Sequence, residues 1–193
     1  MSFQDAKHEA LKLLKNNWGE AIAINLIYSL LLGIIGICGG IGALLLGSIL
    51  LIGYYSCLIH ASNTNKFKLE HLFSGFKDDG LSNRILLSVI KNIYIFLWSL
   101  LFVIPGIIKS YSYFLAEFIS MQHPDMTPTE CLNESRRLMD GHKMNLFVLE
   151  LSFIGWHILC LFTFGIGYFF LTPYINQTKI EYINANILEI KNI

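Results

Sequence analysis

The feature that most constrains this chain is a series of long apolar stretches, each broken once by glycine or proline. The central stretch, Leu100–Tyr113, contains Pro105-Gly106. Proline inside a helix removes a backbone donor and clashes with the preceding turn, so we expect a helix to end there. Further breaks at Gly39-Gly40 and Gly165-Ile166-Gly167 fall at similar intervals. The pattern predicts three helical hairpins, with Pro105-Gly106 at the tip of the middle one.

The chain also carries too few charges to cover a water-soluble surface. Hydrophobic residues make up 54% of its 193 residues and charged residues only 15%, whereas an ordinary soluble domain has about a quarter charged residues. This composition indicates an integral membrane protein whose main partner is the lipid bilayer. Lys plus Arg equals Asp plus Glu, at 14 each, which argues against a basic surface that binds nucleic acid.

We therefore predict an all-α fold, a polytopic membrane helical bundle of about six transmembrane helices in three hairpins, because segments of about 20 apolar residues cross a hydrocarbon core of about 30 Å. The hairpins cover residues 18–61, 84–122 and 143–187 of a single membrane domain, 1–193. The expected spans are Trp18–Cys38, Ile41–His60, Ile85–Ile104, Gly106–Met121, Met144–Phe162 and the less apolar Tyr168–Tyr182. Because Pro173 interrupts the last segment, 168–187, it is either a kinked sixth span or a short insertion followed by a surface helix.

Amphipathic helices are expected to accompany the spans. In residues 1–17, a lysine-free stripe predicts an interfacial helix, although a packed soluble helix would show the same stripe: Phe3, Ala6, Ala10, Leu14 and Trp18. Residues 127–141 predict a surface helix along the bilayer, because Thr127 and Glu130 form a capping box and Gly141 suits the stop. In the linker between the first two hairpins, one short apolar turn is expected to lie on the membrane: Leu69, Leu72, Phe73 and Phe76.

Charge placement predicts the orientation. In the hairpin scheme the N-terminus, both long linkers and the C-terminus lie on one side of the membrane. Most basic residues fall on that side: Lys7, Lys12, Lys15, Lys66, Lys68, Lys77, Arg84, Arg136, Arg137, Lys143, Lys179 and Lys191. By the positive-inside rule this side is cytoplasmic, so both termini are expected in the cytoplasm. Lys91 and Lys109 depart from the pattern, and Lys109 is expected to snorkel near an outer hairpin tip.

Charged residues within spans are the best candidate site, because each costs about 2.5–3.5 kcal/mol near the bilayer centre. We predict that Lys91, Glu117 and Glu150 meet in a polar pocket open to the cytoplasm, with Glu181 at its rim. His157 lies seven residues after Glu150 and hence on the same helical face. The group is either a structural network that fixes helix register, a ligand pocket or a catalytic site.

Other chemistry has little support in the sequence. The histidines are scattered without metal-binding spacing: His8, His60, His71, His123, His142 and His157. Cys38, Cys57, Cys131 and Cys160 lie far apart, and no serine has a nucleophile motif. We expect no metal and no cofactor. Tryptophan is expected to anchor the chain at the interface or to pack, rather than to form a binding cage.

Several motifs, in this order along the chain, resemble one family. They are Leu72-Phe73-Ser74-Gly75-Phe76-Lys77, Ile104-Pro105-Gly106 followed by Ile107-Ile108-Lys109-Ser110-Tyr111-Ser112-Tyr113, Ser135-Arg136, Met139-Asp140-Gly141-His142-Lys143, Leu151-Ser152-Phe153-Ile154-Gly155-Trp156, Gly165-Ile166-Gly167 and Pro173-Tyr174. The chain resembles the bacterial membrane proteins catalogued as domain of unknown function 975. The resemblance implies a bacterial, mostly Gram-positive, cytoplasmic-membrane protein of about six helices and supplies no activity. The family is also distantly similar to membrane domains attached to some glycerophosphodiester phosphodiesterases, but phosphodiesterase residues are not recognisable here.

The leading hypothesis is a non-enzymatic accessory or scaffold protein, or one that binds a lipophilic small molecule; a membrane protein is another expected partner. A transporter with a cytoplasm-facing polar pocket is the second class, although the hairpins show no clear inverted duplication. A membrane-embedded enzyme is the third. A water-filled cavity lined by Glu117 and Glu150 would favour transport or catalysis, whereas a dry, packed centre would favour the scaffold.

Overall fold

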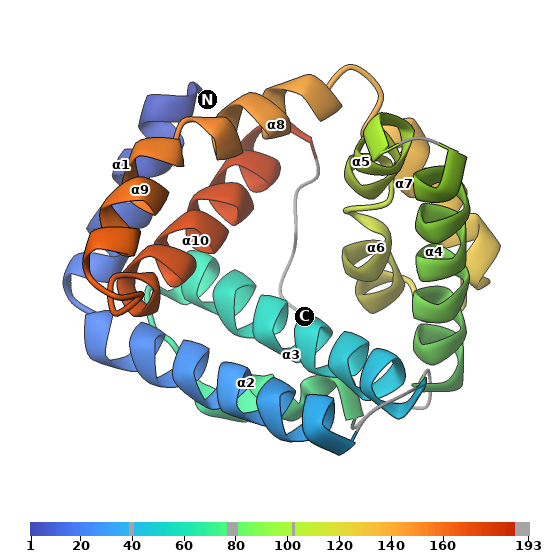
Figure 1. Ribbon diagram of the computed structural model, residues 1–193, viewed down its shortest axis with the longest axis horizontal. Helices are drawn as coiled ribbons and strands as arrows, with labels where there is room; N and C mark the ends of the chain where they lie inside the picture. The colour runs from blue at the N-terminus through green and yellow to red at the C-terminus, as the bar shows by residue number, and fades with distance from the viewer. Residues whose placement is uncertain (39–40, 77–80, 102, 188–193) are drawn as a thin grey trace.

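The computed structural model describes residues 1–38, 41–76, 81–101 and 103–187, and all regular elements in these ranges are helical, which confirms the all-α prediction. In chain order, the elements are α1 (Phe3–Lys15), α2 (Trp18–Cys38), α3 (Ile41–Thr64), the 3-10 helix η1 (Leu69–Phe76), α4 (Leu81–Leu101), α5 (Val103–Ser112), α6 (Ala116–Gln122), α7 (Pro128–Leu138), α8 (Lys143–Leu151), α9 (Ile154–Phe162) and α10 (Tyr168–Asn186). Viewed down the short axis of the molecule, they surround a common centre, with α2 and α3 on one side, α4 to α7 on another and α8 to α10 completing the ring (Figure 1).

The first predicted hairpin is present as α2 packed against α3, and its glycine break, Gly39-Gly40, lies outside the described residues. On α3, backbone contact with η1 requires glycine, because a Cβ at Gly53 would lie 1.8 Å from the Leu72 carbonyl oxygen. Gly75 of η1 is required for the same reason, because a Cβ there would lie 2.7 Å from the Ile49 carbonyl oxygen. The apolar turn of the linker is therefore held against α3, with Leu72 fully buried and Phe73 exposed.

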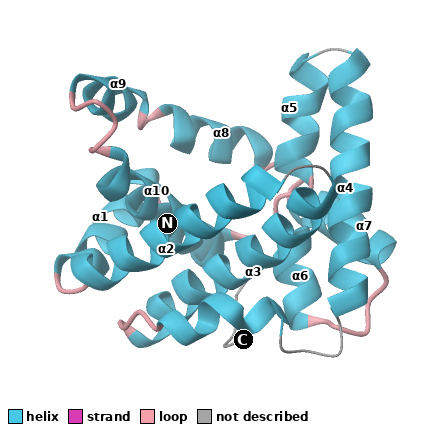
Figure 2. Ribbon diagram, turned by 60° about the horizontal axis from the view of Figure 1, so that its bottom comes forward, coloured by secondary structure: helices cyan, strands magenta, loops and turns pink. Residues whose placement is uncertain are grey.

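The second hairpin turns earlier than predicted. Since α5 begins at Val103, Pro105 lies in the first turn of a helix, where its missing N–H has no intrahelical acceptor to lose. The prediction that a helix ends at Pro105-Gly106 is therefore wrong. At Gly106 an added Cβ would lie 2.1 Å from Ser99 Oγ and 3.0 Å from Ser99 Cα, so glycine lets α5 lie close to α4. Figure 2 shows the two helices side by side.

Two predicted spans are each divided into two helices. The expected span Gly106–Met121 is interrupted by a turn at 113–115 between α5 and α6, and Ser135 Oγ donates to the Ser112 carbonyl at 2.9 Å. The expected span Met144–Phe162 is interrupted at 152–153 between α8 and α9, where Lys7 Nζ lies 3.4 Å from the Ser152 carbonyl oxygen. Side chains from other helices thus contact the carbonyls exposed where these helices end.

The last segment is one helix, since α10 continues from Tyr168 to Asn186 with Pro173 inside it. The turn at Gly165 precedes it, and Gly165 adopts φ +85°, the left-handed region that favours glycine. Within the described residues, two helical segments are long and apolar enough to cross a membrane, Trp18–Ile37 and Lys143–Phe162. The six-span bundle remains a prediction.

Both amphipathic helices form as predicted. On α1, Ala6 and Ala10 have no exposed surface, and this face packs against α10, with Phe3 and Tyr182 ring centroids 5.4 Å apart. Burial lowers the pKa of the Lys7 amine on the same helix. At the start of α7, the predicted capping box is confirmed, because Thr127 Oγ1 and Glu130 bond to each other's backbone N–H groups. Whether either helix touches a bilayer stays a prediction.

Candidate functional site

Four charged side chains of the predicted spans lie in two ion pairs. Lys91 of α4 pairs with Glu117 of α6, and their side chains are 15% and 2% exposed. Glu150 of α8 pairs with Lys179 of α10, at 34% and 14% exposure, and also accepts a hydrogen bond from the Tyr111 hydroxyl of α5. A buried charge is tolerated when an opposite charge and hydrogen bonds compensate its desolvation. Glu150 has both kinds of compensation, and Glu117 has its compensation from Lys91.

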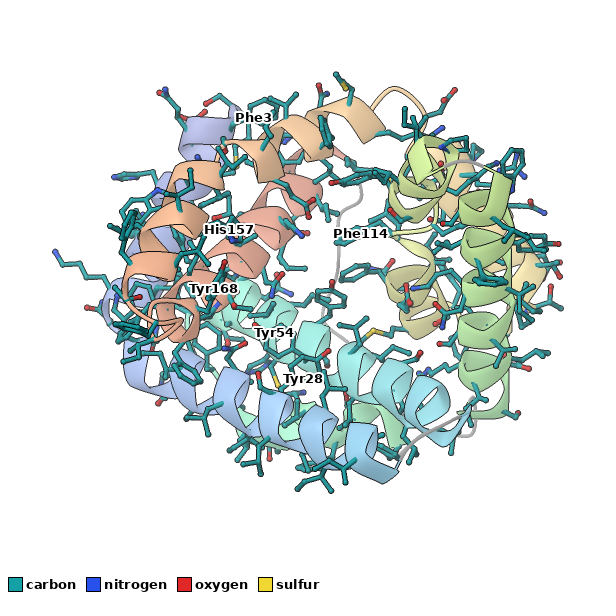
Figure 3. All side chains as sticks on the ribbon, viewed as in Figure 1. Phe3, Tyr28, Tyr54, Phe114, His157 and Tyr168 are labelled. Carbon is teal, nitrogen blue, oxygen red and sulfur yellow. The ribbon has the colours of Figure 1, made fainter. Side chains whose placement is uncertain are left out.

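An aromatic cluster lies between the two ion pairs. Phe114, in the turn between α5 and α6, extends toward the centre of the molecule (Figure 3). Its ring centroid is 5.7 Å from Lys179 Nζ and 6.0 Å from the Tyr55 ring. The Tyr55 ring in turn packs in a tilted arrangement against Phe118, the residue after Glu117, with ring centroids 4.8 Å apart. The division of the fourth predicted span thus places an aromatic side chain where it contacts one of the pairs directly.

The predicted cluster of three charges is only partly assembled. The structure brings Lys91 to Glu117, but it places Glu150 in a separate pair with Lys179. Glu181 accepts a hydrogen bond from Gln177 at 3.0 Å within α10. Sequence reasoning missed Lys179 and Tyr111 as partners of Glu150. The sequence had assigned Lys179 to the cytoplasmic side of the membrane. The only signal that Lys179 could belong to the charged site was its position two residues before Glu181, on the same stretch of α10.

His157 lies near the turn between α9 and α10. Its Nδ1 is 3.4 Å from the Tyr168 hydroxyl, and the two rings are 5.6 Å apart (Figure 3). The predicted shared face with Glu150 assumed one continuous helix. Because the chain turns at 152–153, the seven-residue spacing does not put the two side chains on one helical face.

An apolar cavity of about 350 Å³ lies between α1, α2, α9 and α10. Its lining contains no charged side chain and consists of Leu11, Trp18, Trp156, Leu159, Cys160, Thr163, Gly167, Phe170, Leu171 and Tyr174. Pockets that hold small molecules usually measure about 300–1,000 Å³ and are mostly apolar. This cavity therefore suits a hydrocarbon chain or another lipophilic group.

The part of the chain that the structure describes contains no cluster of potential metal ligands. No group of three or more His, Cys, Asp or Glu side chains there is close enough to hold an ion. Cys57, Cys131 and Cys160 are buried and free. They behave as small hydrophobic residues.

Comparison with known proteins gives one match. The model of the family described as "Protein of unknown function (DUF975)" matches residues 1–109 and 100–189. No curated protein and no solved structure matches the chain. Because the two matched regions together cover nearly the whole sequence, the chain belongs to the DUF975 family.

Proposed function

We propose that this chain is a non-enzymatic integral protein of the bacterial cytoplasmic membrane that holds a lipophilic molecule in the cavity between α1, α2, α9 and α10. The observation that carries the proposal is the distribution of polarity. Large apolar side chains face outward, among them Leu100, Ile104, Phe162 and Phe164 at 74%, 71%, 79% and 98% exposure. Soluble monomers rarely expose apolar surface of this extent.

The proposed architecture is the six-span bundle in three hairpins. Lipid would contact the outward faces of α2, α4, α5, α8 and α9. The turns at 113–115 and 152–153 would divide two of the spans, and non-helical backbone is tolerated at membrane depth where protein satisfies it. The contacts of Ser135 and Lys7 with the freed carbonyls support this. The two segments that are long and apolar enough to span a membrane are also mostly unburied. Only 17% and 22% of their residues are buried, whereas the core helices of a soluble protein are mostly buried.

The proposed role is structural and ligand-holding, without catalysis or transport. Glu117 is nearly inaccessible and already paired, and its neighbours Ala116 and Phe118 have no exposed surface. A packed centre of this kind supports a scaffold, because a transport path needs polar groups that water can reach. The two ion pairs would fix the register of α4 on α6 and of α8 on α10. A protein partner would then dock on the outside of the bundle as an accessory interaction.

Retention of the lipophilic molecule tests the proposal. The protein would be extracted in detergent and analysed by native mass spectrometry for a bound lipid-soluble molecule. Leu159→Trp fills the cavity, whereas Leu161→Trp adds the same bulk to a side chain of α9 that does not line it. We expect at least about a tenfold loss of retained molecule in L159W, corresponding to about 1.4 kcal/mol. L161W should retain it. No retained molecule in the unmodified protein, or equal retention in the two variants, would overturn the ligand-holding role.

A further inference from the structure

A second cleft, of about 260 Å³, lies between α4, α5 and α7 and differs in chemistry from the apolar cavity. It is lined by Tyr94, Trp98, Lys109, Tyr113, Thr129, Leu132, Asn133 and Arg136. Two of these side chains are cations, four offer a hydroxyl or amide group, and none is a carboxylate. The cleft therefore combines positive charge with neutral hydrogen-bond donors.

The two cations face the cleft without an acidic partner among the described residues. Lys109 Nζ lies over the Trp98 ring at 4.7 Å from its centroid and 5.9 Å from that of Tyr113. Arg136 comes from α7, on the other side of the cleft. Its neighbour Arg137 is different, because its guanidinium donates to both carboxylate oxygens of Glu134, at 2.6 and 2.8 Å. Glu134 therefore neutralises Arg137, whereas Arg136 lines the cleft together with Lys109.

The sequence had predicted Lys109 near an outer hairpin tip and Arg136 on the cytoplasmic side. The structure instead lines one cleft with both, because α7 packs against α4 and α6. Two like charges in one cleft repel each other unless an anion joins them. Such a juxtaposition is unfavourable for the empty protein and favourable for an anionic ligand.

We infer that this cleft binds a phosphate-type anion, with Lys109 and Arg136 as its charge partners. Arginine offers a planar pair of donors that matches phosphate oxygens, and lysine binds phosphate as a point charge. Thr129 and Asn133 supply neutral donors from α7. The phosphate can belong to a lipid headgroup or be free in solution. The side chains beside Trp98 on α4 favour the lipid, because Leu97 and Leu100 are largely exposed and would lie along its acyl chains.

The inference is independent of the apolar cavity, and only its lipid form rests on the proposed membrane location. The test titrates detergent-solubilised protein with phosphatidylglycerol, inorganic phosphate or diacylglycerol, and follows binding by native mass spectrometry and thermal unfolding. Lys109→Gln and Arg136→Gln each remove one cation from the cleft. Arg137→Gln is the matched control, since it removes the same charge one residue away and outside the lining.

We expect saturable binding by the unmodified protein and by R137Q. K109Q and R136Q should each bind at least about tenfold more weakly, and K109R should restore most of the affinity. Binding of phosphatidylglycerol with no response to inorganic phosphate assigns the site to a lipid headgroup, and comparable responses assign it to free phosphate. Equal affinities of R136Q and R137Q, or equal binding of diacylglycerol, would overturn the inference. If a glutamine variant fails to fold, K109R and R137Q still show whether an anion binds.

Discussion

Glu117 has a carboxylate that is 2% exposed and has Lys91 as its ion-pair partner. Removing one member of a buried pair leaves the other charge desolvated without compensation, and the typical loss is about 3–5 kcal/mol. Replacing both members removes the need for compensation. The energetic effect of either single change therefore depends on the presence of the other residue.

A double-mutant cycle tests this dependence. We expect Lys91→Met and Glu117→Gln each to lower the Tm of the protein in detergent, and the double variant to lose clearly less than the sum. The expected interaction energy is about 0.5–3 kcal/mol. The matched cycle pairs Lys91→Met with Glu150→Gln, which the structure assigns to the other ion pair, and it should be additive. Additivity in the Lys91–Glu117 cycle would contradict the pairing.

The residue scale also shows the limit of prediction from sequence. Sequence reasoning selected Lys91, Glu117 and Glu150, because a charge in an apolar helix needs a partner wherever the helix lies. It could not select Lys179 as the partner of Glu150. That choice depends on how α8 crosses α10, which no local pattern encodes. His157 was displaced from its predicted face for a related reason, the turn at 152–153.

At the scale of helices, Gly106 decides how closely α5 approaches α4. The contact occurs near the end of the hairpin, where a Cβ at position 106 would overlap Ser99 Oγ and approach Ser99 Cα at 3.0 Å. The backbone of α4 therefore limits any relief by side-chain rotation. Gly155 of α9 is a natural comparison, because nothing lies within 4 Å of its Cβ position.

We expect Gly106→Ala to destabilise the protein by about 1–3 kcal/mol, the usual range for overpacking. Gly155→Ala should be neutral or stabilising by up to about 1 kcal/mol, because alanine is the better helix former. Thermal unfolding in detergent measures both. Adding Ser99→Ala to Gly106→Ala should recover only part of the loss. Equal Tm values for the two single variants would show that α4 and α5 are not in close contact.

The cap of α7 gives an element-scale prediction for pH. The hydrogen bonds from the backbone N–H and hydroxyl of Thr127 lower the pKa of the Glu130 carboxyl below its usual value of 4.5. A lowered pKa means that the stabilisation is fully present above the usual value and is lost as the pH falls through the lowered one. We expect the protection of the first amides of α7 against hydrogen exchange, taken relative to the intrinsic exchange rate at each pH, to fall over that acidic range. Glu130→Gln should remove this pH dependence, and an unchanged acid response in E130Q would contradict it.

The helices show which local rules were sufficient. The start of α7 was predictable because Thr127, Pro128 and Glu130 act within one turn. The start of α5 was not, since the rule that proline ends a helix does not distinguish the interior from the first turn. The contact of η1 with α3 was also out of reach. Glycine is required at position 53 because the backbone of Leu72 lies close to it, and at position 75 because the backbone of Ile49 does. Both partners are distant in the sequence.

Over the whole molecule, the two described ends of the chain meet. The Met1 amine donates to Asn186 Oδ1 at 2.8 Å, so the start of α1 and the end of α10 lie together. In a membrane protein of this arrangement both ends belong on one side. We expect reporters fused to the two termini to signal the same compartment, the cytoplasm. Opposite compartments, or a detergent-free preparation that stays monodisperse, would contradict the membrane architecture.

The positions of the two ion pairs along the chain have a consequence for biosynthesis. Lys91 and Glu117 both belong to residues 84–122, and Glu150 and Lys179 both belong to residues 143–187. Lys91 and Lys179 are therefore each synthesised together with the carboxylate that pairs with them, within one predicted hairpin unit. A unit that pairs these charges internally can bring them into lipid without waiting for later segments. The Tyr111 hydroxyl then joins the two completed units through Glu150.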